Sequence, residues 1–370
     1  MTQILTYEQI DRTEWSTLVR ESRTGTWFQS PEAYGLFASL PDLFRPFAIG
    51  VERVNELTSE RISELTGERK LCGVCVGYVT KEKNALRQYF TRRAIILGGP
   101  CLAEDCSDAE ITALLEAVKS KTRHLSPIYI ETRNFNDYSR WRGAFERAGF
   151  VYKPHLNFHI DCRDNAKMWE RLSDTRKRQI RRVTSERVNE LTGERVKGLT
   201  DERMNGLVDE GDIIEWYGIL ERLYRTKVKT PLWPVEFFLE AHRQGAAKYL
   251  LVRHEGKVIG GMMIVTSERI NELTNGGCIY EWYICGLDTE YKEQYPSVMA
   301  TWAAMEYANQ HGLARFDVMG AGEPGVPYGV RDFKAEFGGE LVEHGRYLCV
   351  LKPMLYKLGT IGVKILKKQK

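Results

Sequence analysis

Apolar and polar positions along the chain predict strands and helices in an order that occurs twice. In the first half, helices are predicted over residues 8–22, 31–40, 108–125 and 139–149, and strands over 45–51, 70–79, 92–102, 127–133 and 155–162. In the second half, helices are predicted over 165–182, 213–226, 234–245, 297–312 and 331–339, and strands over 247–255, 257–265, 278–287 and 314–320. This β-β-β-α-β order in each half predicts a duplicated α/β module with two mostly antiparallel sheets.

An eight-residue sequence, ERVNELTS, recurs with small changes at three places in the chain. Two copies occupy residues 52–67, three occupy 186–209 and one occupies 268–275. Repeat architectures use longer and contiguous units, and a period of eight does not fit a heptad coiled coil. We therefore interpret the copies as insertions into surface connections, where extra chain length costs little.

The places of these insertions predict what surrounds them. The insert at 52–69 separates the predicted strands 45–51 and 70–79, and the insert at 268–275 separates 257–265 from 278–287. Both are expected at the tips of β-hairpins, whereas the insert at 186–209 follows a basic helix. Solvated inserts are the favoured interpretation, and a binding role is the alternative.

Length and composition limit the class of protein. The chain has 370 residues and a mass of 42.6 kDa, which fits two domains of roughly 100–200 residues each. Apolar residues make up 43% and charged residues 28%, which excludes disordered and fibrous classes. Five copies of the repeat carry a net charge of −1 and the sixth is neutral, so without them the net charge rises from +3 to +8. This basic remainder indicates an anionic partner: a phosphate-rich substrate, a nucleic acid or an anionic membrane surface.

The sequence also bears on location and redox state. No apolar run approaches the ~20 residues that span a bilayer, and the opening residues lack the apolar core of a signal peptide. We therefore expect a cytoplasmic protein. The eight cysteines lack the spacing of a disulfide scaffold, and the lone C-x-x-C of Cys72 and Cys75 lies in a predicted strand. We expect buried strand cysteines rather than a redox or zinc motif.

Several segments together resemble the Fem aminoacyltransferases, which add amino acids to peptidoglycan precursors. The segment PYGVRDFKAEFGGELVEHGRY at 327–347 looks like the C-terminal signature of that family. Further matches are WFQS at 27–30, GGP at 98–100, ETRN at 131–134, ERAGF at 146–150, RKRQIRR at 176–182 and FDVMGAG at 316–322. The resemblance covers nearly the whole chain outside the repeats, and the order and spacing of its pieces make it specific.

The resemblance implies a fold and an activity. It implies two acetyltransferase-like (GNAT) lobes in tandem, with the C-terminal strand returning to the first lobe. The first lobe is then expected over 1–162 and 344–370 and the second over 163–343. The implied reaction moves an aminoacyl group from aminoacyl-tRNA to an amine of a peptidoglycan precursor or another cell-envelope acceptor, with aminoacyl-tRNA as co-substrate and no cofactor.

Three residues are expected to serve the chemistry. By resemblance, Phe333 and Lys334 would contact the end of the aminoacyl-tRNA, where an ammonium could neutralise a phosphate or the developing oxyanion. Phe337, on the same helix face, is expected in the core. Asp317 ends a predicted strand before a glycine-rich loop and could orient the amine or accept its proton, or simply cap that loop. The loop at 320–325 fits G-x-G-x-x-G, but Pro324 argues against a following helix and favours a turn.

Other residues are expected to hold the substrates. The basic segment could bind phosphates of a sugar nucleotide, a lipid pyrophosphate or tRNA through Arg176, Arg178 and Arg181, or form a solvated face. By resemblance, the acceptor would be lined by Tyr224, Arg225, Lys227, Tyr280 and Tyr283. The family often has a lysine shortly after the WFQS-like segment, but 31–44 contains none, which favours a lipid-linked acceptor.

Two other functions stay open. A CoA-dependent N-acyltransferase would share the fold, but neither 98–110 nor 286–298 has the Q/R-x-x-G-x-G/A loop that usually holds the pyrophosphate of acyl-CoA. A non-catalytic module that binds tRNA or membrane lipid is the other alternative. The histidines show no metal-ligand spacing, so we expect no metal.

The C-terminal segment is basic and amphipathic. Residues 352–370 contain six lysines, and Leu355, Leu358, Ile361 and Ile365 recur at helical spacing. This pattern is typical of a helix that lies on a membrane surface, here the inner face of the cell membrane, although a flexible tail or a docked terminal helix would give the same pattern.

Overall fold

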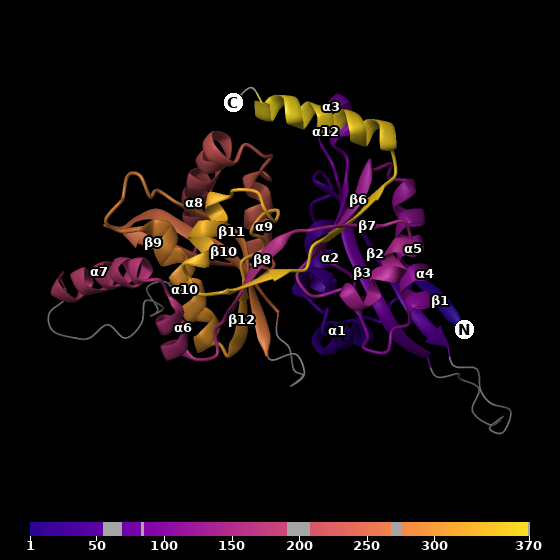
Figure 1. Ribbon diagram of the computed structural model, residues 1–370, viewed down its shortest axis with the longest axis horizontal. Coiled ribbons are helices and arrows are strands. Elements are labelled where there is room, and N and C mark those ends of the chain that lie inside the picture. Colours follow the sequence, from indigo (N-terminus) through magenta and orange to yellow (C-terminus); the bar gives the residue numbers. More distant parts are fainter. Residues whose placement is uncertain (55–68, 83–84, 191–207, 268–275, 369–370) are drawn as a thin grey trace, which may run out of the picture. The chain divides into compact units, whose positions relative to one another are not determined.

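The computed structural model describes residues 1–54, 69–82, 85–190, 208–267 and 276–368, with side chains except at 85–87, 185–190 and 362–368. The chain forms two compact units. The first unit comprises Met1–His155 and His344–Lys370, and the second comprises Leu156–Glu343. Each unit contains one β-sheet flanked by helices (Figure 1).

The first unit follows the predicted order of elements up to residue 149, with the unpredicted strand β1 at its start and the unpredicted helix α3 between two of its strands. Its strands are β1 (Thr2–Thr6), β2 (Phe44–Val54), β3 (Arg69–Thr80), β4 (Ala94–Gly98), β5 (Cys101–Leu102), β6 (Tyr129–Asn134), β7 (Val151–Lys153) and β14 (Arg346–Val350). Its helices are η1 (Tyr7–Gln9), α1 (Arg12–Glu21), η2 (Trp27–Gln29), α2 (Pro31–Ala38), α3 (Ala85–Thr91), α4 (Asp108–Arg123), η3 (Ser139–Trp141), α5 (Arg142–Arg147) and α12 (Pro353–Lys368).

The first sheet has the order β1-β2-β3-β4-β6-β14-β7, with β5 paired to β3. Its pairs are antiparallel except for β4 and β6, which are parallel and are connected through α4. The strand β14 comes from the C-terminal segment and lies between β6 and β7.

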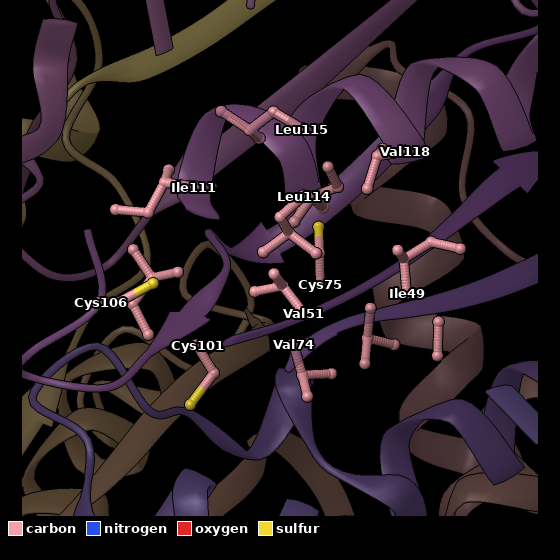
Figure 2. Close-up of a cluster of buried hydrophobic side chains, with 14 of the residues drawn as sticks. Ile49, Val51, Val74, Cys75, Cys101, Cys106, Ile111, Leu114, Leu115 and Val118 are labelled. Carbon is pink, nitrogen blue, oxygen red and sulfur yellow. The ribbon is translucent and has the colours of Figure 1, made fainter. Parts of the chain in front are cut away.

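The core of the first unit lies between this sheet and α4. The serine Ser107 caps the helix in a reciprocal capping box with Glu110, which fixes where α4 begins. The apolar side chains of α4 then recur at spacings of three and four residues and face the strands, as Figure 2 shows for Leu114 above Cys75 and Val118 above Ile49. The resulting cluster holds the unit together mainly by burial of apolar surface.

The second unit contains one sheet with the order β13-β8-β12-β11-β10-β9. Its strands are β8 (Leu156–Asp161), β9 (Lys248–His254), β10 (Lys257–Ser267), β11 (Gly277–Gly286), β12 (Leu313–Asp317) and β13 (Glu340–Glu343). Its helices are α6 (Asn165–Arg171), α7 (Asp174–Glu190), α8 (Glu210–Leu223), η4 (Tyr224–Val228), α9 (Val235–Arg243), α10 (Pro296–Gln310) and α11 (Gly329–Ala335).

The helix α10 is the centre of the second core. Eleven of its residues are buried, among them Ala300, Ala303 and Ala304, whose small side chains let the helix pack closely on the sheet. The indole of Trp302 meets that of Trp169 from α6 at 5.5 Å between ring centroids. A helix that is apolar on most of its surface is typical of a fully buried element.

The strand predicted at 155–162 belongs to a different sheet from the one expected. The expected first lobe, 1–162, includes this strand, but β8 pairs antiparallel with both β12 and β13 in the second sheet. The division between the units therefore falls after His155, not after Cys162. The first unit instead ends its N-terminal part with the short strand β7, which pairs with β14.

Two of the repeat insertions lie where hairpin tips were predicted. The strands β2 and β3 pair antiparallel up to Val54 opposite Arg69, and β10 and β11 pair up to Ser267 opposite Cys278. The helix α7 extends to Glu190, five residues into the insert at 186–209. The rest of the three inserts, 55–68, 191–207 and 268–275, lies outside the described residues.

Candidate active site

The candidate site lies where two parallel strands of the second sheet separate. The strands β11 and β12 pair up to Tyr280 opposite Asp317, after which β12 ends and β11 continues to Gly286. A bulge begins at the same level, because Met263 faces Tyr283 while Ile264 faces Glu281, which leaves Trp282 without an opposite residue. In open α/β sheets, ligands bind at the carboxyl ends of such strands.

The ammonium group of Lys334 spans this gap. It comes from α11, and its Nζ donates to the carbonyl oxygens of Val318 and Gly320 at 2.5 and 3.1 Å. The same Nζ lies 2.8 Å from Oε1 of Glu281 on β11. The lysine is only 7% exposed, so the alternative of an exposed helix lysine is wrong. Its three hydrogens match three acceptors, and the charge is neutralised by Glu281.

Glu281 is the residue of this site that the sequence pattern did not indicate. It is 7% exposed, and burial raises the pKa of its carboxyl above the usual range although the Lys334 ammonium opposes this shift. Neighbours on a strand point to opposite faces, and Tyr280 and Glu281 pair in regular register with Val265 and Ile264. Both are buried, like the three residues before them on β11, because α8 and α10 both pack on this sheet.

Asp317 is fully buried at the end of β12 and lies at the centre of a second polar group. Its Oδ1 accepts from Asn157 Nδ2 at 2.8 Å and from the backbone N–H of Met319 at 2.8 Å, and its Oδ2 lies 3.2 Å from His159 Nε2. Burial opposes ionisation of this carboxyl. The hydrogen bond and charge of His159, the charge of Arg315 and the Asn157 amide nevertheless hold its pKa below the usual range.

The polar side chains around Asp317 both cap the glycine-rich loop and orient a histidine. The Asn157 amide accepts from the N–H of Gly320, and Asp317 accepts from Met319, so the start of the glycine-rich loop is fixed. His159 stands directly opposite Asp317 in the antiparallel pair of β8 and β12, and its side chain retains 12% exposure. A buried carboxylate that orients a partly exposed imidazole is an arrangement suited to proton transfer. In the sequence, His159 can be recognised only as a residue of a predicted strand. The pattern alone does not show that this strand pairs with the one that ends at Asp317.

The residues 320–325 form no helix, and α11 begins only at Gly329. The prediction of a turn in place of a dinucleotide-binding loop is therefore confirmed. The backbone of this turn is anchored by Arg331, whose Nε donates to the carbonyl oxygen of Ala321 at 2.7 Å.

Arg176 has a different role from the expected one. Its guanidinium lies over the rings of Phe333 and Phe337, at 4.5 and 5.2 Å from their centroids, and its Nη1 donates to Gln179 at 2.7 Å. The side chain is buried, and burial lowers the pKa of the guanidinium. Arg176 thus joins α7 to α11 through Phe333 and does not face a phosphate from solvent. The prediction that Phe337 belongs to the core is confirmed.

The other two arginines that were expected to bind phosphate are exposed. Arg178 contacts Thr175 on its own helix, and Arg181 lies over the ring of Trp169 at 5.2 Å. The guanidinium groups of these two arginines therefore lie at the surface of α7. That they contact a phosphate stays a prediction.

The expected acceptor residues fall into two groups. Tyr224 and Tyr283 lie together, with 6.1 Å between ring centroids, and Tyr283 also packs on Phe238. Arg225 and Lys227 are exposed on the π-helical turn η4 that follows α8. Tyr280 is separate from both groups, since its side chain is fully buried in the sheet.

Some segments of the Fem-like pattern have structural roles in the first unit. The amide of Gln29, from WFQS, accepts from Val76 N–H and donates to the carbonyl oxygens of Val76 and Leu97. It therefore links β3 to β4 just beyond their last paired positions. Glu131, from ETRN, forms ion pairs with Arg133 and Arg346. Neither residue needs a substrate to explain its burial.

In a CoA-dependent acyltransferase, the pyrophosphate of acyl-CoA would bind at the start of α10 or of α4. In this protein an acidic side chain already accepts hydrogen bonds at each of these two helix starts. At α10, Asp288 accepts from the N–H and the hydroxyl of Ser297 at 3.0 and 2.6 Å. At α4, Glu110 accepts from the N–H of Ser107 at 2.8 Å, and its pKa is lowered to about 2, chiefly by hydrogen bonds from Arg53. Both positions present negative charge where a phosphate would need positive potential.

All eight cysteines are buried and form no disulfide, and Cys72 and Cys75 lie on β3, as predicted. Within the described residues, no cluster of three or more histidine, cysteine, aspartate or glutamate side chains could hold a metal ion. None of the helices in the described part of the chain combines the length and apolar character that crossing a bilayer requires.

Comparisons with known proteins agree with the two-unit architecture. Residues 175–334 match the family described as acetyltransferase (GNAT) domain, and no curated protein matches the chain. FemX superposes with a TM-score of 0.64 at 13% identity, over 96% of this chain and 99% of that one. The C-terminal domain of a putative lysylphosphatidylglycerol synthetase from Agrobacterium fabrum superposes with a TM-score of 0.50 at 10% identity, over 94% and 93% of the two chains. A conserved protein of unknown function from Bacteroides thetaiotaomicron gives 0.50 at 10% identity, over 94% and 99%. The chain therefore has the Fem-like fold of two GNAT lobes in tandem, which is an acyltransferase fold.

Proposed function

We propose that this protein is an aminoacyltransferase that moves an aminoacyl group from aminoacyl-tRNA to an amine of a peptidoglycan precursor or another cell-envelope acceptor. The observation that carries the proposal is the polar cluster of Lys334, Glu281, Asp317 and His159 where β11 and β12 separate. Two of these residues, Asp317 and Lys334, lie in the segments 316–322 and 327–347 that resemble the Fem aminoacyltransferases.

In this proposal His159 is the proton acceptor. The acceptor amine attacks the ester carbonyl carbon of the aminoacyl-tRNA, a C–N bond forms, and the ester C–O bond to the ribose breaks. His159 takes the proton that the amine loses and returns it to the leaving ribose oxygen. Asp317, ionised because its pKa is held low, orients the imidazole and stabilises its protonated form.

Lys334 positions the loop and supplies charge at the gap. Its contacts with Val318, Gly320 and Glu281 join the two separating strands, so a donor whose acyl end enters between them meets the ammonium. Because these three acceptors take all of its hydrogens, the ammonium would have to exchange one of them to meet a developing oxyanion, and its first role is to position the loop. Phe333, beside Arg176, would contact the end of the tRNA.

Exposed residues of the second unit would hold the acceptor and the phosphates. Arg178, Arg181, Arg225 and Lys227 are all exposed cations, as an anionic precursor requires. A lipid-linked acceptor is favoured because the segment 31–44 lacks a lysine. The name of the Agrobacterium relative describes lysine joined to a membrane lipid, which supports both an aminoacyl donor and a lipid acceptor on this fold.

A CoA-dependent N-acyltransferase is the second candidate, and the GNAT family match to residues 175–334 favours it. The carboxylates of Asp288 and Glu110 at the two helix starts weigh against it, because they take backbone N–H groups and would repel the pyrophosphate.

The test is a donor comparison with purified protein. Radiolabelled aminoacyl-tRNAs or acyl-CoAs are mixed with lipid-linked or nucleotide-linked muropeptide, and the labelled product is measured for the wild type and Lys334→Met. We expect Lys334-dependent transfer from aminoacyl-tRNA. Transfer from acyl-CoA alone would overturn the proposal in favour of the second candidate.

A further inference from the structure

The first unit carries a cluster of exposed apolar side chains on two of its helices. Met354, Leu358 and Ile361 of α12 are 82%, 59% and 45% exposed, and Tyr89 and Phe90 of α3 are 54% and 50% exposed. We call these five residues the apolar surface. Single exposed apolar residues are ordinary, but a contiguous group indicates an interaction site.

The helix α12 has one packed face and one bare face. Its start is docked by Tyr356, whose ring meets that of Tyr129 at 5.5 Å, and by Lys352, whose Nζ donates to the carbonyl and hydroxyl oxygens of Ser126. Met354, Leu358 and Ile361 are spaced by four and three residues, so they share the other face. The side chain of Ile365, which continues this spacing in the sequence, lies outside the described residues.

The helix α3 lies beside the start of α12 (Figure 1). The Nζ of Lys352 lies 5.8 Å from the centroid of the Tyr89 ring, and the rings of Tyr89 and Phe90 meet edge to face at 5.1 Å. Aromatic side chains next to a lysine, with their rings exposed, suit the boundary between lipid headgroups and acyl chains.

The C-terminal segment that contains α12 carries charge of one sign in its sequence. Residues 352–370 contain six lysines and no acidic residue, and Lys357 is exposed on α12 between Met354 and Leu358 in sequence. An apolar stripe flanked by lysines complements an anionic bilayer, which accepts apolar side chains below its headgroups and cations at them. A nucleic acid would use the lysines but not the five apolar side chains.

We propose that the apolar surface binds the first unit to the surface of an anionic lipid bilayer, with α12 lying in the plane of the headgroups. This proposal concerns the first unit alone and does not depend on the activity proposed for the second unit. Binding requires both the apolar side chains and the lysines, since either one alone gives marginal affinity.

Vesicle flotation tests the proposal. The full chain is mixed with vesicles of phosphatidylcholine, or of phosphatidylcholine with about one third phosphatidylglycerol, and the floated fraction gives an apparent Kd. The variants are the double change Leu358→Ser and Ile361→Ser, and the single change Lys357→Glu. The matched control is Ile214→Ser, which alters a 53% exposed isoleucine on α8 in the second unit.

We expect the wild type and the control to bind anionic vesicles, more weakly at high salt, and to leave phosphatidylcholine vesicles unbound. The double variant should bind at least about tenfold more weakly. Lys357→Glu should bind at least about fivefold more weakly, because loss of one lysine near a charged surface accounts for that factor and the new carboxylate adds repulsion. Circular dichroism should show all variants folded. Equal binding by the double variant and the control, or no flotation of the wild type at low salt, would overturn the proposal. Self-association of the wild type that the double variant loses, without vesicle binding, would replace the bilayer with a second copy of the chain.

Discussion

Lys334 and Glu281 form a buried ion pair, with 2.8 Å between Nζ and Oε1, at the point where the parallel strands β11 and β12 separate. Neither residue is more than 7% exposed. A buried pair of this kind contributes little net stability compared with two apolar residues, but losing one partner leaves the other uncompensated. The pair therefore ties the glycine-rich loop to β11, and its two members should respond to mutation together.

A double-mutant cycle tests this coupling. We expect Lys334→Met to lower the free energy of unfolding of the second unit by about 3–5 kcal/mol, because it leaves Glu281 buried without a cation. The double change Lys334→Met with Glu281→Gln should cost less than the sum of the two single changes, since neither charge then remains. Urea unfolding followed by tryptophan fluorescence measures all four proteins. Additive effects within about 0.5 kcal/mol would show that the pair is not coupled.

The proposed roles of His159 and Asp317 predict a defect in turnover. His159→Gln should lower kcat for aminoacyl transfer by about 10²–10⁴ and leave the KM of the donor nearly unchanged, since the imidazole acts on the proton in transit. Asp317→Asn should also lower kcat, because the amide cannot stabilise a protonated imidazole. Steady-state kinetics with the active donor measure both.

The control for this prediction is His311→Gln, which changes an exposed histidine at the end of α10 in the same unit. It should leave kcat and KM unchanged. If His159→Gln behaves like His311→Gln while the enzyme stays folded, His159 is not the proton acceptor.

Most elements of the fold could be predicted from the sequence because their signals are local. The hairpins β2–β3 and β10–β11 were predicted on either side of their inserts, since long apolar strands flank each insert. The sheet to which β8 belongs could not be predicted, because the apolar pattern of a strand does not indicate which other strand it pairs with. The pairing of β8 with β12 and β13 in the structure shows that it lies in the second sheet.

The site was predicted only in part for a similar reason. The motif around Lys334 identified the lysine, but not that three acceptors surround it. Glu281 was missed because the sequence does not show that both faces of this part of β11 are buried. Arg176 was expected at a phosphate because it stands in a basic run, whereas the packing of α7 on α11 buries it over Phe333.

The capping box of α4 predicts a pH dependence. Arg53 donates to both carboxylate oxygens of Glu110 at 2.8 Å and lowers the pKa of Glu110 to about 2. Because this value lies below the unfolded value of about 4.3, the pair stabilises the fold above the unfolded value, and the contribution is lost as pH falls through the folded pKa.

We therefore expect Glu110→Gln to be about 1–3 kcal/mol less stable than the wild type at neutral pH, because Arg53 loses its charged partner. The difference should shrink as the pH falls from the unfolded pKa toward the folded one. Urea unfolding over this pH series measures it. A difference that stays constant with pH would mean that packing, and not the ionised carboxylate, accounts for the loss.

Gly99 of the GGP segment and Gly218 of α8 should respond in opposite ways to substitution by alanine. Gly99 has φ of +76°, and a Cβ there would lie 2.7 Å from Oη of Tyr138, whose hydroxyl bonds the carbonyl oxygens of Gly98 and Pro100. Gly99→Ala should therefore destabilise the first unit by about 2–4 kcal/mol, from backbone strain and overpacking together.

Gly218 is the matched control, because it lies inside α8 and a Cβ added there would meet nothing within 4 Å. Gly218→Ala should stabilise the protein by up to about 1 kcal/mol, since alanine restricts the unfolded chain and favours the helix. Thermal unfolding of both variants by calorimetry measures the pair. If Gly99→Ala unfolds at the wild-type temperature, the turn after β4 has room for a side chain, and the contact with Tyr138 cannot explain why a glycine stands there.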